Sequence, residues 1–177
     1  RAMPVDDGTT LWVIIKVDNG EAPKAGNSGS GGPGYATVTC AYQLDQSKID
    51  ALISALNAYR AQNGLAPFTI NEQLNEAAQA HANDMACNQL FYHNGSNGST
   101  PTTRVAASGY AAAYVTENVY GSYPPLTGAE VISWWANDTA DPRHNENLLS
   151  AKYTEIGIGY SFFNNYGYYV IDFTVPA

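Results

Sequence analysis

The chain has 177 residues, of which 45% are hydrophobic, and this is enough for one well-buried core but too little for two ordinary domains. Its formal net charge is −8 with only eight lysines and arginines, so it repels phosphate backbones and nucleic acid is not expected as a partner. No apolar run is as long as a membrane span.

The first 39 residues differ in kind from the rest. The apolar, β-branched run TLWVIIKV (10–17) predicts a strand, either the last of a preceding module or an extension laid onto the main domain. The Gly/Ser-rich run NGEAPKAGNSGSGGPG (19–34) predicts a flexible linker. We therefore divide the chain into an extension, 1–39, and a compact domain, 40–177. Because no charged-then-apolar leader precedes it, we expect a mature chain whose export signal has been removed.

The compact domain begins with helical patterns. In residues 47–64 one face carries the apolar side chains Ile49, Leu52, Ile53, Leu56 and Tyr59. Ser47 with Asp50 resembles a capping box, and Gly64 supplies the stop. A second helix is predicted from about 71 to 88, with the face Leu74, Ala77, Ala78, His81 and Met85. Shorter helices are expected from Thr100 to Gly109 and over about 127–137.

The end of the chain reads as strands. Residues 154–163 and 166–175 both alternate, and the turn-forming pair Asn164-Asn165 between them predicts a hairpin. YVTENVY (114–120) is a further candidate strand. Helices flanking such a sheet predict an α+β layered domain.

The two cysteines allow one pairing. Cys40 precedes the first predicted helix and Cys87 ends the second, so a disulfide between them ties two helices together. Few lysines and an even cysteine count favour an exported protein with that disulfide. The alternative is two unrelated buried thiols.

Three histidines limit the candidate chemistry. His81 lies on the apolar face of the second helix, which favours a hydrogen-bonded core residue. His93 lies in a polar loop and His144 just inside a helix start at Asp141-Pro142. Their spacing contains no local metal motif, so the alternative of two unrelated surface histidines stays open.

A longer pattern resembles a known family. The segments DMA and FYHNGS, then TEN, PRHNENLL and YTEIGIGY, follow one another over residues 43–174 as in bacterial members of the CAP superfamily, the cysteine-rich secretory and pathogenesis-related proteins. The resemblance implies a CAP-type α-β-α sandwich, in which a small antiparallel sheet lies between helical layers. It also implies a secreted, extracellular protein.

The resemblance implies a cleft with two histidines and acids. His93 and His144 match the family's histidines, and Glu117 matches the glutamate of its Gly-Glu-Asn signature, although Thr116 replaces the glycine. Asp138 stands where many members have a glutamate. It is one methylene shorter and lies beside an apparent insertion, which puts its reach into the cleft in doubt.

Two imidazoles with carboxylates suit zinc or another divalent ion, with Glu117 orienting a ligand or acting as a base. We expect a non-catalytic or weakly active recognition module for an extracellular ligand, such as a lipid or cell-surface component. The alternatives are a metal-assisted hydrolase of peptide or ester bonds and a lipid or sterol carrier. Tyrosines at 110, 114, 120 and 123 could line a groove, although packing at the sheet is the more ordinary role.

Overall fold

The computed structural model describes residues 2–4, 12–14 and 34–177. The predicted linker therefore lies outside the described residues, apart from Gly34. Part of the predicted N-terminal strand is described as β2 (Trp12–Ile14), which pairs with β1 (Ala2–Pro4) and with the end of β4 (Ala112–Tyr123). The division between residues 39 and 40 stays a prediction.

The sheet has the strand order β1-β2-β4-β6-β5-β3. Its centre is the predicted hairpin of β5 (Glu155–Phe163) and β6 (Tyr166–Pro176), joined through Asn164 and Asn165, both of which have positive φ as a type I′ turn requires. β3 (Thr69–Ile70) was not predicted, and it pairs with β5 in parallel. The sheet is therefore mixed, and the expectation of a purely antiparallel sheet is wrong at this edge.

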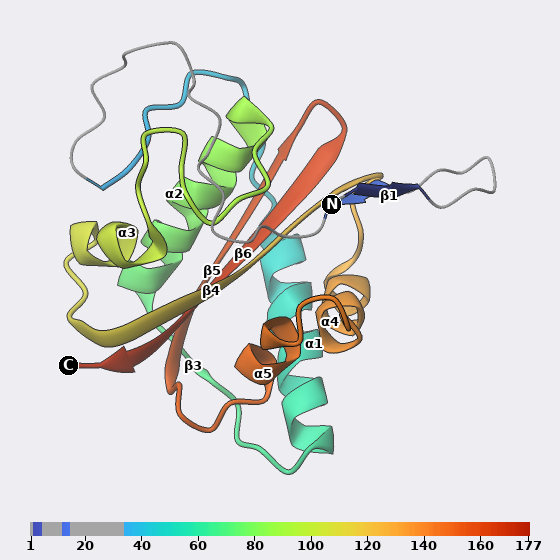
Figure 1. Cartoon of the computed structure of the whole chain (residues 1–177), viewed down its shortest axis with the longest axis vertical. Coiled ribbons are helices and arrows are strands. Elements are labelled where there is room, and N and C mark those ends of the chain that lie inside the picture. The colour runs from blue at the N-terminus through green and yellow to red at the C-terminus, as the bar shows by residue number, and fades with distance from the viewer. Residues whose placement is uncertain (1, 5–11, 15–33) are drawn as a thin grey trace.

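Helices cover both faces of the sheet (Figure 1). One layer contains α1 (Gln46–Gln62), α4 (Gly128–Ala136) and α5 (Arg143–Leu148). The other contains α2 (Glu72–Asn88) and α3 (Pro101–Ala107). This arrangement confirms the predicted α-β-α sandwich. Among the described residues, no helix is both long and apolar enough to cross a membrane.

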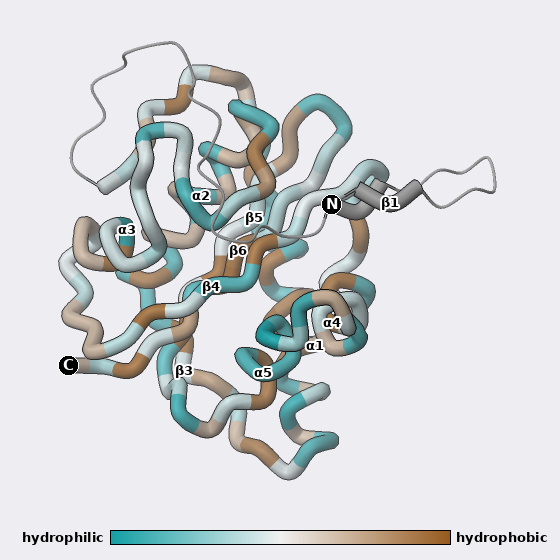
Figure 2. Tube along the Cα trace, in the orientation of Figure 1, coloured by the Kyte–Doolittle hydropathy of each residue, from teal (hydrophilic) through white to brown (hydrophobic). Residues whose placement is uncertain are grey.

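Alternation along the strands builds one core on each face. On β6, Tyr169, Ile171 and Phe173 pack with α1 and α4, while Tyr168 and Val170 pack against α2. Hydrophobic segments accordingly run through the middle of the sheet in Figure 2, and polar residues colour α5 and parts of α1. The same alternation places Glu117 on the α2 and α3 face of β4.

The first helix begins earlier than predicted. Its N-cap is Asp45, whose carboxylate accepts from the backbone N–H of Ser47, so the expected cap at Ser47 is wrong. Aspartate at this position satisfies an N–H that has no partner within the helix. The predicted end is confirmed, because Gly64 follows the helix with a φ of 73°.

Glycines on β5 let α2 approach the sheet closely. A Cβ at Gly157 would lie 2.0 Å from the backbone carbonyl carbon of Leu74, and one at Gly159 would lie 2.5 Å from that of Ala78. Leu74 and Ala78 are both fully buried, as the predicted face of α2 requires. The contact with β5 thereby fixes the position of α2 on the sheet, and with it the point from which the following loop starts.

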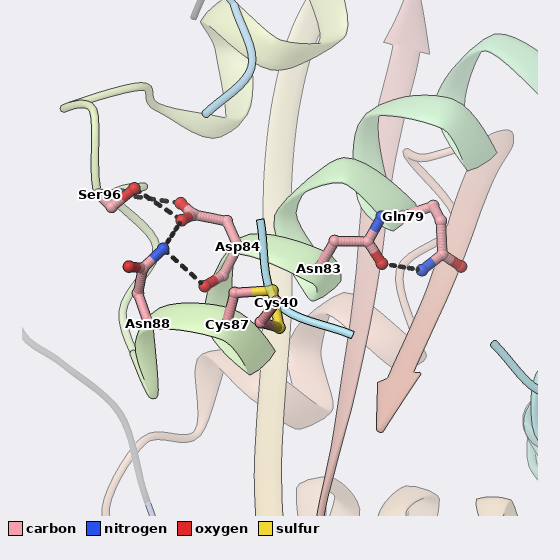
Figure 3. Close-up of a disulfide and its surroundings, with 7 residues drawn as sticks. All are labelled: Cys40, Gln79, Asn83, Asp84, Cys87, Asn88 and Ser96. Carbon is pink, nitrogen blue, oxygen red and sulfur yellow. Dashed lines mark hydrogen bonds between the residues drawn. A yellow bond between two sulfur atoms is a disulfide. The ribbon is translucent and has the colours of Figure 1, made fainter. Parts of the chain in front are cut away.

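A disulfide and a buried carboxylate hold that loop. Cys40 and Cys87 are bonded with their Cα atoms 5.4 Å apart, which confirms the predicted bridge (Figure 3). It joins the segment before α1 to the last turn of α2. Close by, the carboxylate of Asp84 accepts hydrogen bonds from the backbone N–H of Ser96 at 2.7 Å and from the Ser96 hydroxyl at 2.6 Å. It also accepts from the side-chain amide of Asn88 at 2.7 Å. The loop that carries His93 is therefore held to α2 at Ser96, while the disulfide fixes the end of α2 from which the loop starts.

Candidate functional site

A cleft of about 220 Å³ opens where the two helical layers meet the outer edge of β4. Residues 115–117 of β4 form its middle. The loop after α2 and the start of α3 supply one wall, and the segment around α5 supplies the other. Its lining residues are His93, Pro101, Thr102, Val115, Thr116, Glu117, Asp141, Arg143, His144 and Asn147. Two histidines far apart in the sequence thus reach one cleft from opposite sides of the sheet.

On the α3 side, His93 is held by a buried ion pair. Its Nδ1 lies 2.9 Å from Oε1 of Glu117, and Arg104 donates to Oε2 of the same carboxylate at 2.6 Å. Arg104 also donates to the backbone carbonyl of His93 at 2.9 Å. Glu117 and Arg104 are buried, whereas the His93 side chain is 31% exposed. Because an ionised carboxylate can only accept, Nδ1 of His93 is the donor in this contact, and Nε2 is the nitrogen that has a lone pair when the ring is neutral.

The charges around Glu117 decide its protonation. Burial alone raises the pKa of this carboxyl, but Arg104, His81 and His93 outweigh burial and lower the pKa to about 2. Burial and the neighbouring Arg104 lower the pKa of His81 to about 4, so its imidazole is neutral. His81 is buried as predicted, with Nε2 2.8 Å from the carbonyl of Tyr92. The site therefore holds one carboxylate that stays ionised over the physiological range.

A second carboxyl lies beside this pair. Asp172 is opposite Glu117 in the β4–β6 register and is fully buried. Burial, together with the charge of Glu117, raises its pKa well above the ordinary value. Within the described part of the chain, neither of its carboxyl oxygens has a hydrogen-bond partner. Burial thus favours the protonated form of Asp172, while Arg104 lies against the carboxylate of Glu117.

On the α5 side, His144 is arranged in the same way. Its Nδ1 lies 2.8 Å from Oδ2 of Asp138, and both side chains are buried. The shorter aspartate thus contacts the imidazole of His144, although it is not one of the residues that line the cleft. Burial lowers the pKa of His144, against the opposing effect of Asp138, so the neutral imidazole is favoured. Its backbone carbonyl accepts from Asn118 at 3.1 Å, which ties α5 to β4.

Polar side chains complete the α5 wall. The amide of Asn147 donates to Oδ1 of Asn118 at 2.8 Å and approaches the hydroxyl of Thr116 at 3.4 Å. At the rim, Arg143 donates to both carboxylate oxygens of Asp141 at 2.8 Å. This fork-to-fork pairing fixes Asp141 at the mouth of the cleft.

The side chains at the cleft provide few free ligands for a metal ion. Across residues 34–177, no group of three or more His, Cys, Asp or Glu side chains is arranged to hold an ion. Both oxygens of Glu117 are engaged by His93 and Arg104, and Asp138 is engaged by His144. The cleft therefore offers two imidazole rings, each oriented by a carboxylate, and an ion would complete its coordination with water or a ligand.

The tyrosines near Glu117 do not line this cleft. Tyr110 and Tyr120 are buried in the core. Tyr114 and Tyr123 are exposed, and they stack against Tyr153 and pack against Tyr166, respectively. Three of the four thus pack on other aromatic rings, Tyr120 on that of Trp134. The fourth, Tyr110, donates a hydrogen bond to Glu155.

Sequence reasoning did not single out Arg104, Asp172 or Asn147. Arg104 lies on a short helix among threonines and alanines, where an arginine usually faces water. A signal was available for Asp172, because it interrupts the apolar run of a central strand and buried acids need a reason. Asn147 had no such signal.

Comparisons with known proteins identify the family. A sequence profile of the CAP family, the cysteine-rich secretory protein family, matches residues 53–173, and the chain belongs to this family. It is 28% identical over 138 residues to the uncharacterized protein YkwD of Bacillus subtilis, which covers 76% of this chain and 52% of YkwD. The chain therefore matches about half the length of that relative.

Solved structures show the same fold. An outer surface protein of Borrelia burgdorferi matches with a TM-score of 0.66 and 20% identity, over 75% of this chain and 95% of that one. An extracellular protein of Bacillus anthracis that contains an SCP domain matches with a TM-score of 0.63 and 20% identity, over 73% of this chain and 41% of that one.

Proposed function

We propose that this protein is an extracellular recognition module whose cleft binds a divalent ion, zinc by preference, through Nε2 of His93 and His144. The observation that carries the proposal is the matched orientation of the two rings. Each has its Nδ1 against a buried carboxylate, Glu117 or Asp138, which leaves Nε2 of the neutral ring to bind a ligand. Carboxylate-held imidazoles are the usual partners of zinc in proteins.

The donor set favours an exchangeable ion. Two neutral imidazoles suit a borderline ion such as Zn²⁺ better than Mg²⁺ or Ca²⁺, which prefer oxygen ligands. Two protein ligands leave positions that water or a bound ligand fills, so the ion contributes to recognition at the cleft. A structure of NaASP2 with Zn²⁺ shares this fold, at 11% identity and a TM-score of 0.50.

Binding is supported better than hydrolysis. A general base works best with a pKa near the working pH, whereas the pKa of Glu117 is about 2 and both its oxygens are engaged. A lipid-carrying role at this cleft has little support either. Histidines, threonines, an asparagine and an ion pair line it, and acyl chains need apolar walls.

An extracellular location fits the covalent structure. The Cys40–Cys87 disulfide persists in oxidising compartments, and proteins described as extracellular or outer-surface share the fold. The acidic charge keeps such a domain soluble.

Calorimetric titration with zinc tests the proposal. The wild type is expected to bind one ion, and the His93→Ala/His144→Ala double variant to lose that binding while its thermal unfolding stays cooperative. Glu72→Gln/Glu76→Gln is the matched control, since it removes two exposed carboxylates of α2 and leaves the cleft intact. Equal zinc affinity in the wild type and the histidine variant would show that surface acids bind the ion, and the proposal would be wrong.

A further inference from the structure

The backbone groups on the outer sides of β5 and β4 differ in how many of them have hydrogen-bond partners. On β5, α2 side chains satisfy the outward N–H groups, since Asn75 accepts from Ile158 at 2.9 Å and Gln79 accepts from Tyr160 at 3.2 Å. Gln43 pairs with Phe162 further along, and β3 pairs with the start of the strand. The β5 edge is therefore closed along its length, as proteins usually arrange to prevent unwanted pairing.

Among the described residues, the outer edge of β4 is closed only at one end. β2 pairs with it at residues 121–123, and the indole of Trp135 donates to the carbonyl of Val119 at 3.3 Å. Backbone groups on a strand point to either side alternately, so the outward series that contains Val119 also contains Val115 and Glu117. Within residues 34–177, no group outside the sheet forms a hydrogen bond with the backbone of those two residues.

This open stretch is the middle of the cleft. Residues 115–117 line it, and residues 112–116 are exposed or half-buried, whereas 117–122 are buried. Water satisfies such N–H and C=O groups in an open cleft, and a ligand that replaces this water must offer both a donor and an acceptor at strand spacing. A polypeptide backbone has that spacing, and β2 already uses the same edge just beyond Val119.

We infer that the ligand of this cleft is an extended peptide segment, which adds to the sheet as a short strand alongside residues 113–117 of β4. The inference rests on the proposed recognition function and names its ligand class. Main-chain hydrogen bonds to Val115 and Glu117 supply most of the contact. The walls carrying His93 and Thr102 on one side, and Asn147 on the other, receive alternate side chains of the peptide.

The probe is an array of end-blocked hexapeptides of random sequence, applied to the full chain with a chelator present. The strongest binders are then remade with N-methyl groups on alternate residues, in two complementary patterns. One pattern blocks the peptide edge that pairs with β4 and is expected to weaken binding at least about tenfold. The other blocks the edge that faces solvent and is expected to bind as before.

Two further measurements locate the contact. Binding is expected to slow hydrogen exchange of the outward amides of Val115 and Glu117. Val115→Pro removes one outward N–H, a change that edge strands tolerate, so it is expected to abolish peptide binding with little loss of stability. If that variant does not fold, the paired N-methyl peptides still decide the question.

Three results would overturn the inference. These are an array without binders, binders that tolerate both N-methyl patterns, and outward amides already protected in the free protein. The last result would mean that this chain, or a second copy of it, fills the edge. Because a chelator is present throughout, a failure of the zinc proposal leaves these outcomes unchanged, and a failure here leaves the calorimetric result unchanged.

Discussion

Arg104 is the residue on which the cleft depends most for stability. Arg104→Met keeps much of the side-chain volume but leaves the buried carboxylate of Glu117 without its guanidinium partner, beside Asp172 and two imidazoles. Removing one partner of a buried ion pair costs about 3–5 kcal/mol, because the remaining charge is left without compensation. For a chain of this length, that corresponds to a fall in melting temperature of roughly 6–20 °C.

Urea unfolding followed by tryptophan fluorescence measures this loss. The control is Arg104→Met/Glu117→Gln, in which no charge is left buried and the amide oxygen still accepts from His93. We expect the double variant to be more stable than the single one by about 1–3 kcal/mol. A loss below about 1 kcal/mol for Arg104→Met, the size expected for an exposed ion pair, would refute the account of this cluster.

The pH dependence has a fixed sign. The pKa of Glu117 is about 2 in the folded protein, against an ordinary value of 4.5, so its ionised form stabilises the fold. This contribution is fully present above pH 4.5 and is lost as the pH falls toward 2. Without Arg104, burial raises the pKa of Glu117 in the folded variant, so the stability difference between the wild type and Arg104→Met should shrink as the pH falls toward 2. A difference that stays constant down to pH 2 would contradict the assignment.

Three further outcomes are expected. Cys40→Ala/Cys87→Ala should lower the free energy of unfolding by about 4 kcal/mol for a separation of 47 residues, and denaturation with and without reductant checks whether the wild type loses the same amount. Gly157→Ala should lower the free energy of unfolding, measured in urea, by about 3 kcal/mol or more, because the added Cβ meets the backbone of α2. A loss below about 1 kcal/mol would mean that α2 can move away from the sheet without a large cost. In metal-free protein, an NMR titration should give His144 a pKa below 6.5, so the fold loses stability as the pH falls below that value. Asp138→Asn should lower the pKa of His144 further, and a rise in that pKa would contradict the contact between the two side chains.

Much of the fold could be predicted because its signals are local. The 3.6-residue period of α2, the alternation of β5 and β6, and the turn at Asn164-Asn165 each depend on residues that are close in the chain. The cap of α1 was misplaced by two residues because Asp45 and Ser47 are both good caps. β3 escaped notice because two residues carry no period.

The candidate site was predicted only through resemblance, which named His93, Glu117, His144 and Asp138. Nothing local showed what each residue contacts. Arg104 becomes the partner of Glu117 only when α3 packs over the sheet.

The sequence by itself determined the longer helices and strands, the apolar faces and the single possible disulfide, since these follow from neighbouring residues and from counting. Only the tertiary structure decided that the two histidines share a cleft, that both contact a carboxylate through Nδ1, and that no described segment pairs with the edge of β4 between them. Such features depend on contacts between segments far apart in the chain, and packing of the whole domain sets those contacts.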